Sequence, residues 1–161
     1  MIFNFEIAIL FLAITIWGCQ PNPSPTPTPA PGDWQKIDAK GRFSFLIPPD
    51  IKPDTVQGID SYIGQFQSSN MQINFDYGGH SDPLQYSDKS EYEETITKSD
   101  GRKAKLVTFH DPAMNQNLAY IAAIHFADLG DGQTKLTMWV YGKGREEQII
   151  ATKILQSIKF P

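Results

Sequence analysis

Residues 118–141 read Leu118-Ala-Tyr-Ile-Ala-Ala-Ile-His-Phe-Ala-Asp-Leu-Gly-Asp-Gly-Gln-Thr-Lys-Leu-Thr-Met-Trp-Val-Tyr141 and have the pattern of a β-hairpin. Apolar side chains predominate in residues 118–129 and 134–141, and the turn residues Gly130-Asp-Gly132 separate the two runs. Both faces of each run are apolar, which is typical of strands with neighbours on both sides. We therefore expect two central strands, covered on at least one side.

The segments before this hairpin alternate between apolar and polar residues, as strands with one buried face do. In residues 41–47, for example, Phe43, Phe45 and Ile47 share one face. The predicted strands are residues 41–47, 61–68, 71–77, 91–98 and 102–109. The dipeptide Asp100-Gly101 predicts a two-residue hairpin turn, whereas residues 50–59 and 78–90 are predicted loops.

The last predicted element is a helix over residues 145–157. Its apolar residues recur at helical spacing and form one stripe, which consists of Ile149, Ile150, Ile154, Leu155 and, beyond the helix, Ile158. The sequence thus predicts an α+β fold over residues 34–161: a largely antiparallel β-sheet with a packed C-terminal helix.

The N-terminal 33 residues predict export and lipid anchoring. Residues 1–18 form a short apolar segment that ends directly before Cys19, the only cysteine of the chain. Because lipoprotein signal peptides are built in this way, we expect Cys19 to carry acyl chains such as palmitate and to become the mature N-terminus. An uncleaved N-terminal anchor is the alternative. Proline at every second position from 21 to 31 predicts an extended tether over residues 19–33.

The net charge of −4 and the lack of a long basic run give no support to nucleic-acid binding. A single cysteine also excludes an internal disulfide. The partners that we expect are the lipid bilayer, through acylated Cys19, and an envelope protein.

A polar face on the predicted strands 61–68 and 71–77 is the feature that folding requires least. The candidate binding residues are Gln65, Gln67, Gln72, Asn74, Asp76 and, in the following loop, His80. This face is either simply solvated or the place where a partner docks. Amide-rich faces also bind saccharides, but the sequence does not place a stacking aromatic residue beside these amides.

Catalysis has weaker support than binding. His80 with Asp76 and Asp82 is a sparse metal or substrate pattern, and His110-Asp111 lacks the Gly-x-Ser-x-Gly elbow that would supply a nucleophile. We therefore predict no catalytic residue, no metal site and no cofactor. The alternative is an envelope hydrolase or metal-dependent enzyme that uses the loops at 76–82 and 110–117.

Three short motifs resemble PsbP-like domains. They are the entry Gly41-Arg-Phe-Ser-Phe-Leu-Ile-Pro-Pro49 after Trp34, the hairpin Thr97-Lys-Ser-Asp-Gly-Arg-Lys-Ala-Lys105, and the closing Ile154-Leu-Gln-Ser-Ile-Lys-Phe160. The resemblance covers residues 34–160 and implies an α/β/α sandwich around an antiparallel sheet. That fold is shared by photosystem extrinsic proteins and a Ran-binding nuclear transport factor, which mostly bind or assemble. No metal-binding residue of the photosystem proteins is matched here.

Together these patterns predict a membrane-anchored cell-envelope lipoprotein that acts as a non-catalytic binding or assembly module. The lipid anchor would lie in the cell membrane or the outer membrane. The domain would then lie on the periplasmic or extracellular side.

Overall fold

A seven-stranded antiparallel sheet is the largest element within residues 31–113 and 117–161, which the computed structural model describes. In spatial order its strands are β3 (Lys52–Asp54), β4 (Tyr62–Gln67), β5 (Met71–Gly78), β9 (Lys135–Gly142), β8 (Tyr120–Phe126), β7 (Arg102–His110) and β6 (Ser90–Ser99). The predicted signal peptide, Cys19 and most of the tether lie outside the described residues. The chain enters the described part through a 3-10 turn, η1 (Pro31–Asp33).

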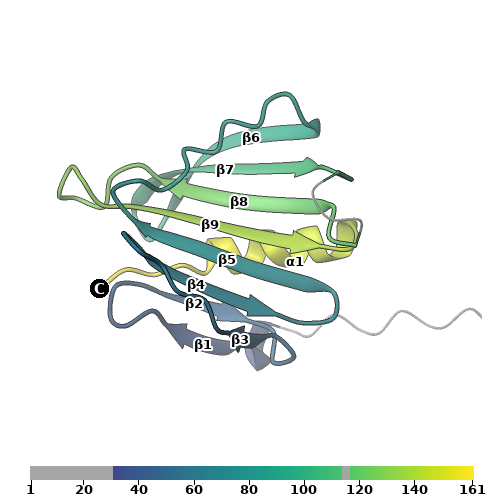
Figure 1. Ribbon diagram of the computed structural model, residues 1–161, viewed down its shortest axis with the longest axis horizontal. Helices are drawn as coiled ribbons and strands as arrows, with labels where there is room; N and C mark the ends of the chain where they lie inside the picture. The colour runs from purple at the N-terminus through teal and green to yellow at the C-terminus, as the bar shows by residue number, and fades with distance from the viewer. Residues whose placement is uncertain (1–30, 114–116) are drawn as a thin grey trace, which may run out of the picture.

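Helix α1 (Arg145–Gln156) covers one face of the sheet and lies behind it in the view of Figure 1. A second, two-stranded sheet of β1 (Gln35–Asp38) and β2 (Ser44–Ile47) packs on the same face beside the helix. The largest side chains of the core between these layers include Phe43, Phe45, Phe66, Phe75, Phe126, Met138 and Ile154. Burial of this apolar surface holds the two layers together.

The predicted sheet and helix are present. β8 and β9 pair with each other in the interior of the sheet, as their apolar faces indicate. The β6–β7 hairpin turns at Asp100 and Gly101, whose φ angles are 53° and 77°. Two successive positive φ angles match the twist of the flanking strands, which explains why glycine follows aspartate at this turn.

Two short strands contradict the local predictions. Residues 52–54, within the predicted loop 50–59, pair with β4 as the edge strand β3. Residues 35–38, for which no strand is predicted, pair with β2 as β1. β1 and β3 form because each pairs with another strand of its sheet. With only four and three residues, they are too short to show a clear alternation of apolar and polar side chains.

The predicted apolar stripe of the helix is wrong at Ile149, which is 59% exposed. The residues of α1 that are buried are Gln148, Ala151, Ile154 and Leu155. Gln148 is tolerated in the core because its Nε2 donates hydrogen bonds to the carbonyl oxygens of Phe109 (3.2 Å) and Ile121 (2.9 Å). Neither α1 nor any other helix in the described residues is long and apolar enough to span a bilayer.

The other sheet face, which we call the outer face, carries a loop and no helix among the described residues. This loop, residues 79–89, covers β7 and β8 by burying Leu84 against Val107, Phe109 and Ile121. Leu84 has a φ of 56°, a left-handed conformation that costs a non-glycine residue roughly 1–2 kcal/mol. Of the two outer layers that an α/β/α sandwich implies, α1 therefore supplies one and a loop takes the place of the other.

Candidate binding surface on the open half of the sheet

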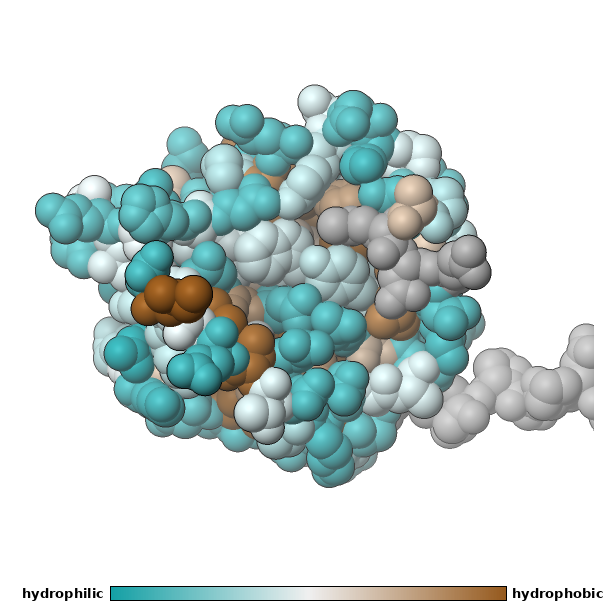
Figure 2. Space-filling model, viewed as in Figure 1, coloured by the Kyte–Doolittle hydropathy of each residue, from teal (hydrophilic) through white to brown (hydrophobic). Residues whose placement is uncertain are grey.

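The outer face is divided into a covered half and an open half. The loop over residues 79–89 covers β7 and β8, whereas the outward side chains of β4 and β5 are half-buried or exposed. Figure 2 looks onto this face and shows hydrophilic side chains gathered beside paler ones near its centre. A partner therefore has access to the β4–β5 half.

Five of the six predicted binding residues lie on this open half. The register of β4 and β5 pairs Gln65 with Asn74 and Gln67 with Gln72. Since side chains alternate along a strand, these four amides and Asp76 share the outer face. Gln72 Nε2 donates a hydrogen bond to Asn74 Oδ1 at 3.1 Å. The side-chain amides of Gln65 and Gln67 bond to none of the described residues, so they are available to a ligand.

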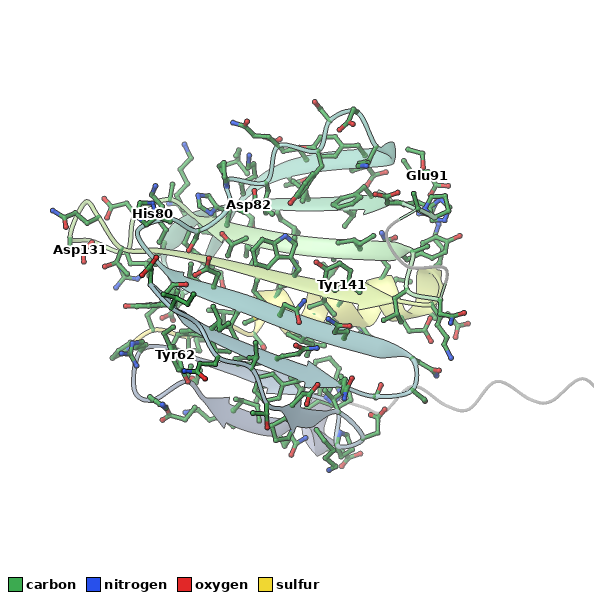
Figure 3. All side chains as sticks on the ribbon, in the orientation of Figure 1. Tyr62, His80, Asp82, Glu91, Asp131 and Tyr141 are labelled. Carbon is green, nitrogen blue, oxygen red and sulfur yellow. The ribbon has the colours of Figure 1, made fainter. Side chains whose placement is uncertain are left out.

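Asp76 and His80 differ from the four amides. The Oδ1 atom of Asp76 is buried and has no hydrogen-bond partner among the described residues. The main-chain oxygen of Asp76 accepts a hydrogen bond from Ser81 Oγ at 2.9 Å, which fastens the start of the loop to β5. His80 is exposed beyond the end of β5, and Figure 3 shows it at one end of the sheet, away from Tyr141, which lies near the C-terminal end of β9.

Two aromatic residues of β9, which are not among the predicted binding residues, complete the surface. The register pairs Asn74 with Trp139 and Gln72 with Tyr141, so each ring stands beside an amide. Both aromatic side chains are half-buried. We call Gln65, Gln67, Gln72, Asn74, Trp139 and Tyr141 the amide–aromatic surface.

The alternation of side chains in residues 135–141 already indicated that Trp139 and Tyr141 face outward. Within residues 135–141 the even-numbered positions face α1, so the odd-numbered positions face outward. The prediction that residues 134–141 are apolar on both faces did not separate the buried positions from the outward ones. The alternation along β9 does not show which amide lies beside each ring, because that depends on which strand pairs with β9.

Packing positions both rings, because Trp139 and Tyr141 lie partly buried against the cluster around Leu84. Tyr86, in the same cluster, donates a hydrogen bond from its hydroxyl to the Asp82 carboxylate. Burial is the largest cause that raises the pKa of the Tyr86 phenol, and the Asp82 carboxylate raises it further. Burial likewise raises the pKa of Tyr141, against the opposing effect of Asn74. Both phenols therefore stay protonated, and the surface is polar without being charged.

The two loops considered for an enzyme lie at opposite ends of the sheet. His80 follows β5 at the end of the sheet where β9 begins. His110 lies at the other end, because it pairs with Tyr120 of β8, which pairs with Gly142 at the end of β9. Asp111 forms an ion pair with Lys89, in which Nζ and Oδ2 are 3.0 Å apart. Residues 114–116 of the second loop lie outside the described residues. In the described part, no three His, Cys, Asp or Glu side chains are grouped to hold a metal ion.

Comparison with known proteins identifies the fold. The structure is similar to the solution structure of cyanobacterial PsbP (CyanoP) from Synechocystis sp. PCC 6803, with a TM-score of 0.53 and 13% sequence identity. The match covers 80% of this chain and 93% of that chain. The sequence matches no family model, and it has no significant match among curated proteins. The likeness confirms a PsbP-like α+β sandwich, and at this identity it concerns the fold alone.

Proposed function

We propose that this chain is a membrane-anchored lipoprotein of the cell envelope whose domain is a non-catalytic binding module. In this proposal the amide–aromatic surface docks an envelope protein, and acylated Cys19 holds the module at the membrane. The proposal of a non-catalytic role rests on the sequence, which offers no nucleophile paired with a base.

The amide–aromatic surface is the observation that carries this proposal. The cores of protein interfaces are depleted in charged residues and enriched in tyrosine and tryptophan, and this surface has both properties. Each amide offers donors and an acceptor, so Gln65 and Gln67 could bond to a partner's backbone or side chains. Trp139 and Tyr141 are already held by packing against the cluster around Leu84, so docking against them would cost little side-chain entropy.

The N-terminal sequence supports the membrane location. An extended proline-rich segment rises about 3.1 Å per residue, so the dozen residues from Gln20 to Pro31 could hold the domain roughly 35–40 Å from the anchor. That distance leaves the amide–aromatic surface free to meet a protein in the same compartment.

The test compares the wild-type protein with the variants Gln65→Arg and Gln72→Arg as baits in detergent-solubilised membranes of the native host. Both positions lie on the amide–aromatic surface and are half-buried, so a charged side chain there should obstruct docking. We expect at least one envelope protein to be enriched by the wild type and reduced about tenfold or more by each variant, which corresponds to ~1.4 kcal/mol.

The control is Gln156→Arg, the same substitution at an exposed position at the end of α1, on the opposite side of the sheet. It should retain the partner at the wild-type level. Equal recovery by all four baits would show that the outer face is not the docking surface.

A further inference from the structure

A hollow of about 600 Å³ lies on the outer face where β7 begins and β8 ends, away from the amide–aromatic surface. Arg102, Lys103 and Lys105 of β7 line it, together with Ile96 of β6 and His125 of β8. Pockets of 300–1,000 Å³ are the usual size for small-molecule sites. Neither the fold nor the proposed docking surface accounts for this hollow.

Among the described residues, the cations of the hollow form no ion pair with a carboxylate. Arg102 Nη1 donates to the carbonyl oxygen of Leu129 at 2.6 Å, and Lys105 Nζ donates to that of Leu84 at 3.0 Å. These bonds fix two of the three cations, whereas Lys103 is exposed. The guanidinium of Arg102 lies over the ring of Phe160, 4.9 Å from its centroid, so the charges that remain available to a ligand are those of Lys103 and Lys105.

The acid that lines the hollow, Asp128, is already engaged. Its Oδ1 accepts hydrogen bonds from the backbone N–H groups of Gly130 (2.7 Å) and Gly132 (3.0 Å). These two bonds are the main cause that lowers the pKa of Asp128, so it stays ionised. Arg102 also lowers the pKa of Asp128, so these two charges offset each other, and Lys103 and Lys105 leave the hollow positive.

His125 adds a neutral hydrogen-bond acceptor to the wall. The hydroxyl of Thr137 donates to the Asp82 carbonyl oxygen at 2.8 Å, so it must accept its 2.8 Å bond from His125 Nδ1–H. Burial is the main cause that lowers the pKa of His125, and Lys105 and Lys135 lower it further. The ring is therefore neutral at pH 7, with its proton on Nδ1 and the lone pair on Nε2.

One wall of the hollow is apolar. Ile96 is 57% exposed on the edge strand β6 and lies opposite Lys105 in the register. Pro83, Ala104 and Ala127 extend this apolar wall. An exposed isoleucine beside unpaired cations favours a ligand with a hydrocarbon part and an anionic group.

The geometry points to a binding site for a small amphiphilic anion. Its carboxylate or phosphate group lies against Lys103 and Lys105, and its hydrocarbon part covers Ile96 and the ring of His125. The chemistry is the same for a free organic acid and for an organic phosphate. Because this hollow is distinct from the amide–aromatic surface, the two proposals can fail independently.

The test titrates sodium hexanoate and hexyl phosphate into the mature chain, residues 19–161, with Cys19→Ser so that no attached lipid competes. Amide signals in NMR spectra report where each probe binds. We expect saturable shifts concentrated on residues 96, 103–105 and 125–130. Acetate, which lacks the hydrocarbon part, and hexanol, which lacks the charge, should each bind at least about tenfold more weakly.

Two variants at exposed positions, Lys103→Glu and Ile96→Ser, should weaken the binding of both probes at least about tenfold without unfolding the domain. Lys153→Glu makes the same charge change at an exposed position of α1 and should bind like the wild type. Binding of only one probe would identify the acidic group and support the site. The proposal is overturned if neither probe gives saturable shifts, if acetate binds as well as hexanoate, or if Lys103→Glu leaves the affinity unchanged.

Discussion

His125 is the residue at which burial and pH are most directly linked. Its folded-state pKa is lowered by burial first, and then by Lys105 and Lys135, while Asp82 acts in the opposite direction. In the unfolded chain a histidine binds its proton near pH 6.5, at about its ordinary pKa. As the pH falls through this value, the unfolded state takes up a proton that the folded state does not. The free energy of unfolding should therefore decrease below about pH 6.5 and level off below the folded-state pKa.

We expect His125→Gln to remove this dependence, which amounts to about 1.4 kcal/mol for each unit by which the pKa is lowered. Urea unfolding between pH 8 and pH 5 measures it. His80→Gln is the matched control, because His80 is exposed in the loop after β5. A His125→Gln profile parallel to that of the wild type would show that another group causes the dependence.

At the scale of one element, the helical spacing of apolar residues in α1 predicts the burial of Ile154 correctly but not that of Ile149. Ile154 is fully buried in the core, whereas Ile149 is 59% exposed. Ile154→Ala should lower the free energy of unfolding by about 2–5 kcal/mol, because it removes buried methyl groups and leaves a cavity. Ile149→Ala should change it by no more than about 0.5 kcal/mol. Chemical denaturation of both variants checks this, and equal losses would contradict the observed orientation of the helix.

At the scale of the whole molecule, the proposed lipid anchor would decide where the domain works. One acyl chain binds a membrane only marginally, so stable attachment needs the two or three chains that a lipidated cysteine carries. We expect the mature protein to begin at a triacylated or diacylated Cys19 and to remain in the membrane fraction. Cys19→Ser lacks the thiol that accepts the lipid and should stay uncleaved after Gly18. Mass spectrometry of the N-terminal peptide measures this. An unmodified Cys19, or a peptide that begins before it, would contradict the lipoprotein proposal.

Local chemistry in the sequence was sufficient to predict most of the strands, both long hairpins and the C-terminal helix. The Asp100-Gly101 turn and the alternation in β5 depend only on neighbouring residues, so they can be read without a structure. The polar side of the β4–β5 hairpin was predicted for the same reason. The position of Ile149 was not, because four isoleucines and a leucine give more than one plausible apolar stripe and only the packed sheet selects among them.

Only the tertiary structure determined which residues lie beside the amides of the amide–aromatic surface and beside the cations of the hollow. Pairing of β5 with β9 joins Asn74 to Trp139, residues that are far apart in the chain. The hollow likewise combines Lys103 of one hairpin with Asp128 of another and Pro83 of a loop. The physical reason is that the strand order depends on burying the whole sheet between α1 and the loop that covers its outer face. This free energy comes from contacts between distant segments, so it cannot be predicted from any short stretch of the sequence.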